Sequence, residues 1–212
     1  MGREIIPIFD PETAKAIQKA SDLGGKVVDA GAGVGRYTAS VFGALPNDLI
    51  GIAGDFIRHK RRMRAVELDR EYQQLLRDRG VKEPIEPSPS ILIPLLSAAV
   101  DEDREVLKAL WARLLANACD PNRKDRVRQS FIELLKKFDP LDAVVLELLG
   151  TVSGAPQPNA RDYVRAKTGQ PENEVMVSLD NLVELGCLGR ASEHWNPHIT
   201  PRGKLLLDAV SK

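Results

Sequence analysis

The sequence predicts a mostly α-helical protein, with a central helical bundle followed by a smaller α+β module. Apolar residues recur at three- and four-residue spacing through much of residues 91–150, which is the period of amphipathic helices. Prolines crowd the stretch GVKEPIEPSPS just before this region, and a helix does not continue easily through them. After residue 150 the pattern changes to helix, turn, helix and hairpin. The 212 residues are enough for one large domain or two small ones with a buried core.

Composition narrows the class of protein. Thirty basic and thirty acidic residues cancel, which argues against a dedicated nucleic-acid coat protein while leaving room for local charge asymmetry. Cys119 and Cys187 lie in apolar stretches without a CxxC partner, so we expect two buried thiols in a reducing compartment. The start MGREIIPIFDPE lacks the apolar core of a signal peptide. We therefore expect a cytoplasmic protein.

Residues 1–57 are predicted to form an N-terminal region with one short helix and a glycine-rich segment. In FDPETAKAIQKASDLGG, Asp10 suits the N-cap, Pro11 the first helical position and Gly24 the exit. Residues 58–80 follow as a charged helix with few apolar residues, among them Met63, Val66, Tyr72, Leu75 and Leu76.

Residues 81–150 are predicted to form the helical bundle. The first strong pattern, in DEDREVLKALWARLLANACD, has its stripe at Leu107, Leu110, Trp111, Leu114, Leu115 and Ala118. In QSFIELLKKF, Ser130 and Glu133 have the spacing of a capping box, before a stripe at Phe131, Leu134, Leu135 and Phe138. In DPLDAVVLELLG, Asp139 suits the cap and Pro140 the first position, with a stripe at Leu141, Val144, Val145 and Leu148. Successive amphipathic helices with short joints predict a bundle with Trp111 in its core.

Residues 151–212 are predicted to form a winged-helix-like module. NARDYVRAKTG and QPENEVMVSLDNLVELG supply two helices, CLGRASEHWNPHIT a hairpin, and PRGKLLLDAV a closing helix. The phrase SLDNLVELGCLGR with ITPRGKLLL resembles the second helix, glycine exit and wing of the winged-helix fold.

The stretch EPSPSILIPLLSAAVDEDREVLKALWARLLANACD, followed by QSFIELLKKFDPLDAVVLELL, resembles the Abi-alpha family of bacterial abortive-infection proteins. The resemblance continues in LDNL and LG at residues 179–186, and it covers roughly residues 80–210. It implies a role in phage defence, and it brings no catalytic motif with it.

The glycine-rich stretch VVDAGAGVGRYT allows three interpretations, of which a cofactor-binding turn is one. In that interpretation a strand ends at Asp29, glycines approach a ligand, and an acid about twenty residues on binds a ribose. The residues of this S-adenosylmethionine-binding, methyltransferase-like alternative are Asp29, Gly31, Gly33, Gly35 and Asp55. Such a fold needs further strands that alternate with helices. The hundred residues after Phe56 predict none of them.

A packed helix is the interpretation that we favour, and a loop without a specific role is the third. Gly31, Gly35, Ala39 and Gly43 recur every four residues, which puts small side chains on one face of a helix. Each interior glycine costs about 1 kcal/mol relative to alanine, so close packing must offset the loss. We therefore expect these four residues to mediate self-association, with a homo-oligomer as the result.

A basic run follows the glycine-rich segment. Residues 37–57 are long enough to span a bilayer, but Asp48 and Asp55 would each add roughly 2.5 to 3.5 kcal/mol at its centre. We expect no transmembrane helix, and instead a choice between a solvated helix face and peripheral contact with the inner membrane. Basic side chains dock on an anionic leaflet at about 1 kcal/mol each. The candidate residues for binding an anionic partner are Arg58, Lys60, Arg61, Arg62 and Arg64.

Specific DNA readout is not expected of the winged-helix-like module, although a DNA-binding regulator remains an alternative. Residues 171–186 contain no Lys or Arg, and four carboxylates would repel a polyanion; these are Glu172, Glu174, Asp180 and Glu184. Asn181 lies within the apolar stripe, where we expect it to satisfy a local backbone group. The module is therefore predicted to bind a protein partner.

No catalytic, cofactor or metal site is expected. The chain contains no HExxH, GxSxG or P-loop pattern. His194 and His198 are four residues apart in the predicted hairpin, without a carboxylate or cysteine that clearly joins them. The predicted function is that of a non-enzymatic antiphage protein.

Overall fold

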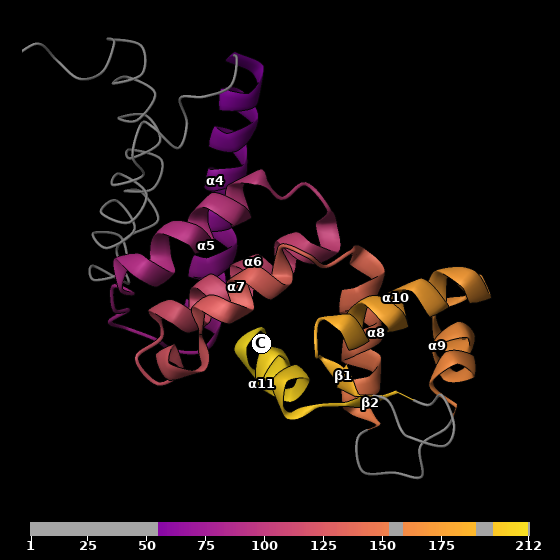
Figure 1. Ribbon diagram of the computed structural model, residues 1–212. Helices are drawn as coiled ribbons and strands as arrows, with labels where there is room; N and C mark the ends of the chain where they lie inside the picture. Colours follow the sequence, from indigo (N-terminus) through magenta and orange to yellow (C-terminus); the bar gives the residue numbers. More distant parts are fainter. Residues whose placement is uncertain (1–54, 153–158, 190–196, 212) are drawn as a thin grey trace, which may run out of the picture.

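The computed structural model describes residues 55–152, 159–189 and 197–211 of the chain. Within these ranges α-helices dominate, and the strands form one two-stranded sheet (Figure 1). The mostly α fold class is therefore confirmed. The expected helix after Asp10 and the glycine-rich segment lie outside the described residues.

Three helices form the first part of the body. Helix α4 spans Asp55–Asp78, α5 spans Pro89–Asp101 and α6 spans Glu105–Cys119. Helix α4 packs against both α5 and α6, and α5 also packs against α6. Figure 1 shows α4 running alongside this pair. The prolines before α5 leave Pro89 at its first helical position, where a missing N–H does no harm.

The buried face of α4 differs from the one that its apolar residues predict. Leu68, Tyr72 and Leu76 are fully buried at four-residue spacing, whereas Met63 and Val66 are 53% and 55% exposed. Four-residue spacing follows one face of a helix, and Met63 and Val66 lie off that row. Met63 and Val66 therefore face solvent, while Leu68, Tyr72 and Leu76 make the packing contacts.

Helix α7 spans Gln129–Leu135 and follows the short 3₁₀ helix η1, Lys124–Arg126. The capping box predicted at Ser130 and Glu133 is wrong. The helix begins two residues earlier than that capping box requires: its N-cap is Arg128, and no side chain caps it. Ser130 already lies in the first turn, so its hydroxyl is not placed to accept the N-cap hydrogen bond.

Helix α8 spans Pro140–Thr151. Its start is as predicted, with Asp139 as N-cap and Pro140 first, and Asp142 completes a capping box. The predicted stripe is displaced by about one residue, because Leu141, Val144 and Leu148 are only partly buried. The residues that do bury are Asp142, Ala143, Val145, Leu146 and Leu149.

The C-terminal elements follow in the predicted order. Helix α9 spans Ala160–Thr168, and α10 spans Glu172–Glu184. Strand β1, Leu188–Gly189, pairs antiparallel with β2, His198–Ile199, with Leu188 opposite Ile199. Helix α11 spans Pro201–Ala209. Its N-cap is Thr200, whose hydroxyl accepts a hydrogen bond from the Gly203 N–H.

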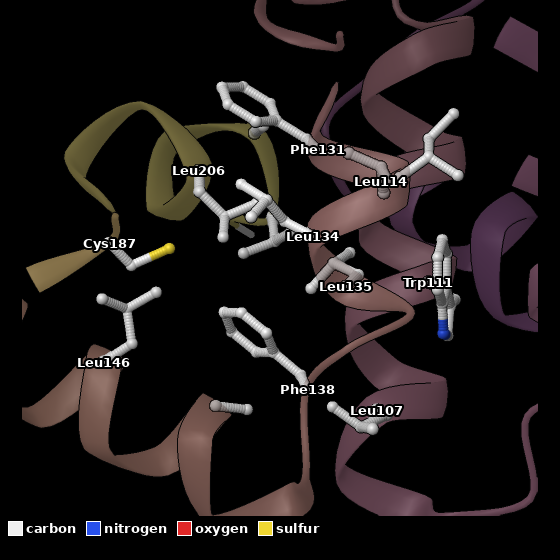
Figure 2. Packing of buried hydrophobic residues seen from close by; sticks show 14 of the residues in the cluster. Leu107, Trp111, Leu114, Phe131, Leu134, Leu135, Phe138, Leu146, Cys187 and Leu206 are labelled. Carbon is white, nitrogen blue, oxygen red and sulfur yellow. The ribbon is translucent and has the colours of Figure 1, made fainter. Parts of the chain in front are cut away.

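One hydrophobic cluster runs from α4 to α11. Trp111 is 1% exposed and lies in this core, as predicted. Figure 2 shows Phe138, Leu146 and Leu206 converging from the end of the α7 segment, from α8 and from α11. Helix α8 packs against α6 of the bundle and against α9, α10, β2 and α11. The domain boundaries expected at residues 57, 80 and 150 stay predictions.

Candidate functional site

Most of the residues predicted at the glycine-rich segment lie outside the described part of the chain. The four residues predicted for self-association are Gly31, Gly35, Ala39 and Gly43. The cofactor alternative adds Asp29 and Gly33, which are also outside. Asp55 opens α4, although its side chain is not among those described. Both interpretations of these residues stay predictions.

The basic run lies in the first turns of α4, and the structure divides it into two groups. Lys60 and Arg62 are exposed, whereas Arg61 is partly buried and Arg64 is 5% exposed. The side chain of Arg58 lies outside the described set. A helix turns by 100° per residue, so a continuous basic run cannot present all of its charges to one side.

Arg61 and Lys60 contact the acidic turn between α5 and α6. Arg61 Nη2 donates to Asp101 Oδ2 at 2.8 Å, and Arg61 Nε donates to Oδ1 of the same carboxylate. This bidentate geometry makes the ion pair directional. The hydrogen bonds to Asp101 raise the pKa of Arg61. Lys60 Nζ lies 3.6 Å from Asp103 Oδ2, but both side chains are largely exposed, so this contact contributes little. The turn therefore holds the start of α4 mainly through Arg61.

Arg64 anchors α4 on α6. Its Nη2 donates to the backbone carbonyl of Lys108 at 3.3 Å. Its Nη1 lies 3.4 Å from Glu71 and 3.5 Å from Glu67. The guanidinium occupies the same inward row as Leu68 and Tyr72, at four-residue spacing. Arg64 thus faces the body, and among the four basic residues of the run whose side chains are described, Lys60 and Arg62 are exposed.

Glu102 holds the acidic turn together. Its carboxylate is 9% exposed and accepts hydrogen bonds from the Arg104 backbone N–H at 3.0 Å and from Arg104 Nε at 2.9 Å. Burial raises the pKa of Glu102, but the Arg104 and Trp111 hydrogen bonds outweigh it, and the net shift is downward. Arg104 also reaches Asp139 at the start of α8. The turn that binds α4 is therefore an ionised, ordered element.

A cleft of about 500 Å³ opens between α6, α8 and α11. Its floor is apolar and includes Leu110, Leu135, Phe138, Leu146 and Leu206. Figure 2 shows four of these side chains, all but Leu110, around one region of the core. Three charged residues also line it, one from each helix: Arg113, Glu147 and Asp208.

Asp142 joins α8 to α10, and sequence reasoning missed it. The carboxylate is 1% exposed. It accepts hydrogen bonds from Ser178 Oγ at 2.6 Å, from Asn181 Nδ2 at 2.6 Å and from the Asp139 N–H at 2.7 Å. The expectation that Asn181 satisfies a local backbone group is wrong, because its amide reaches another helix. Only the capping-box spacing of Asp139 and Asp142 signalled part of this arrangement in the sequence.

In the described residues, potential metal ligands do not cluster and no helix is suited to cross a membrane. No group of three His, Cys, Asp or Glu side chains gathers into a metal site within residues 55–152, 159–189 and 197–211. His198 is exposed on β2, and His194 lies outside those ranges. None of the helices in this part of the chain is both long enough and apolar enough to cross a bilayer.

A match to a known protein family shows which family this chain belongs to. The family model described as abortive infection alpha matches residues 63–201, from the third turn of α4 to the start of α11. The chain belongs to the abortive infection alpha family. This family is one of abortive-infection proteins and is not a known enzyme family. No curated protein and no solved structure matches the chain.

Proposed function

We propose that this member of the abortive infection alpha family protects a bacterial population from phage without catalysing a reaction. Its N-terminal region self-associates through Gly31, Gly35, Ala39 and Gly43, and it does so at the cytoplasmic face of the inner membrane. The helical body from α4 to α11 senses or binds a partner. The observation that carries the proposal is the family match over residues 63–201.

The way α4 is anchored supports separate roles for the N-terminal region, which self-associates, and the helical body, which binds the partner. This helix begins directly after the glycine-rich region and then packs along α5 and α6. The Arg61–Asp101 pair fixes its second turn, and the buried Arg64 fixes its third turn. A close helix–helix contact in the preceding segment would thus be built next to an anchored helix rather than on a free tail.

The order of the C-terminal elements supports a winged-helix-like module that serves as a protein-binding unit. Helices α8, α9 and α10 precede the β1–β2 pair, as the first three helices precede the wing in that fold. Helix α10 exposes Glu172, Glu174 and Glu184. Arg161 and Arg165 of α9 pair with Glu172 at 3.0 Å and 3.2 Å. Because α10 is acidic and the two arginines of α9 beside it are paired with Glu172, the module favours a protein partner over DNA.

The first test replaces the glycines of the predicted contact. Gly31→Val, Gly35→Val and Gly43→Val, combined in the full chain, should abolish protection, because branched side chains keep two backbones apart. Protection is measured as phage plating efficiency on bacteria that express each variant. Self-association is measured by light scattering on the purified proteins, and circular dichroism checks that the body stays folded.

Gly33→Val is the matched control, because position 33 lies off the row of positions 31, 35, 39 and 43. In a packed helix this variant should protect like the wild type. In the S-adenosylmethionine-binding alternative it should fail, since Gly33 would approach the ligand. Full protection by the triple variant would overturn the proposal, and loss of protection in Gly33→Val would favour the cofactor.

A further inference from the structure

An outward stripe on α4 consists of Arg62, Met63, Val66 and Arg70. These positions lie on the side of the helix away from Leu68, Tyr72 and Leu76, which are fully buried. All four stripe residues are exposed, and the two apolar side chains are 53% and 55% exposed. Exposed apolar residues scattered singly are normal, but here two neighbours at i and i+3 lie between two arginines.

The arginines of the stripe differ from the other cations of α4 in their partners. Arg61 is bound to Asp101, and Arg64 to Lys108 and two glutamates. Arg62 and Arg70 make no hydrogen bond or ion pair through their side chains with any described residue. Within the part of the chain that the structure describes, no carboxylate pairs with either charge.

We propose that this stripe docks α4 on an anionic lipid surface. Met63 and Val66 would enter the boundary between headgroups and acyl chains, and Arg62 and Arg70 would bind lipid phosphates on either side. This is the arrangement of interfacial helices, which combine a buried apolar face with flanking cations. The inference rests on the proposed function, and it names the partner of that region.

Repulsion between arginines argues against a second copy of this chain as the partner of the stripe. In an antiparallel pairing centred on Val66, Arg62 of one copy would face Arg70 of the other. In a parallel pairing, each arginine would lie beside its own equivalent. Like charges in direct opposition destabilise such contacts. A nucleic acid would use the arginines but would leave Met63 and Val66 without an apolar environment.

The test measures vesicle binding of the full chain by co-flotation. Vesicles of phosphatidylcholine with phosphatidylglycerol are compared with vesicles of phosphatidylcholine alone. The wild type should bind the anionic vesicles and lose that binding as salt is added, because salt screens exposed charges. Met63→Gln with Val66→Gln should weaken binding by roughly tenfold, since the apolar contact is lost while the charge is kept.

Arg62→Gln with Arg70→Gln should also weaken binding by at least about tenfold, through the loss of two cations. Two matched controls should bind like the wild type. Val177→Gln alters an exposed valine of α10 that is 67% accessible, and Lys124→Gln with Lys204→Gln removes two exposed cations elsewhere. If Met63→Gln with Val66→Gln lowers the melting temperature of the protein, the single variant Met63→Gln replaces it in the binding test.

The outcomes separate this inference from the proposed function. The proposal is overturned if the wild type ignores anionic vesicles, binds both vesicle types equally, or is unaffected by either stripe variant. Loss in the arginine variant alone would also overturn it, because contact would then be by charge only. The glycine variants report on self-association independently, so their effect on protection stands whatever the vesicles show.

Discussion

Asp142 is a single carboxylate that connects parts of the chain 36 residues apart. Its buried oxygens receive a hydroxyl, an amide and a backbone N–H, so the negative charge is matched by three donors. Burying a charge is unfavourable unless donors surround it, and here they do. The residue therefore fixes the relative position of α8 and α10 instead of acting as a reactive acid.

Asp142→Ala should destabilise the fold by about 3 kcal/mol, because the donors of Ser178 and Asn181 lose their buried partner. The change is measured as the free energy of unfolding in urea. Asp208→Ala, at an exposed position of α11, is the control and should stay within about 0.5 kcal/mol of the wild type. Equal stabilities for the two variants would mean that the Asp142 hydrogen bonds are not stabilising.

At the scale of elements, the sequence predicted most of the helices and the hairpin. Three- and four-residue periodicity located α6, α7 and α8, and the Asp139–Pro140 pair gave the start of α8. The faces of α4 and α8 were less predictable. On α4 a buried arginine takes an inward position that an apolar residue would normally mark, and this became visible only with Lys108 and Glu71 in place.

The close approach of α11 to Cys187, the residue before β1, gives the prediction at the scale of elements. A Cβ on Gly203 would lie 2.3 Å from the Cys187 carbonyl oxygen and 3.0 Å from Ile199 Cγ1. Because the nearer atom belongs to the backbone, the start of α11 must move if that Cβ is added. Gly203→Ala should lower the melting temperature by roughly 5 °C, as overpacking does.

Lys204→Ala is the matched control for Gly203→Ala. It alters the next residue of the same helix, whose side chain is exposed. Differential scanning calorimetry should show little change for this variant. A Gly203→Ala protein as stable as the control would show that α11 can shift without loss of packing.

At the scale of the whole molecule, a buried polar cluster joins the end of α4, α6 and the C-terminal segment. Asn117 is fully buried, and its Nδ2 donates to the Ala209 carbonyl at 2.7 Å. Arg79 Nη1 donates to Asn117 Oδ1 at 2.9 Å, and Nη2 donates to the Ser211 carbonyl at 3.0 Å. Two of these three contacts link residues more than ninety positions apart, so α11 is held by the bundle as well as by its own neighbours.

Asn117→Ala should loosen α11 more than the rest of the body. The Ala209 carbonyl and the Arg79 guanidinium both lose a partner, and amide exchange in α11 should rise by roughly tenfold. Hydrogen–deuterium exchange with mass spectrometry compares α11 with α7 in the same sample. Asn122→Ala, at an exposed asparagine, should change neither helix. If amide exchange in α11 is unchanged in the Asn117 variant, the buried polar cluster does not hold α11 in place.

The candidate sites could be predicted only where they were local in sequence. The basic run was visible as five charges in seven residues, but which of them face outward depends on Asp101 and Asp103, some forty residues away. The cleft combines α6, α8 and α11, and no single motif encodes it. The glycine-rich segment keeps its sequence-based interpretation, because its residues lie outside those described.

Burial of both cysteines has a practical consequence. Cys119 and Cys187 are fully buried, and burial raises the pKa of Cys187 to about 11. Since the thiolate is the nucleophile, Cys187 should react very slowly with electrophiles near neutral pH. A cysteine introduced on the outer side of α4 could thus carry a maleimide fluorophore with little competition from the native thiols, and its emission would report the environment of that helix.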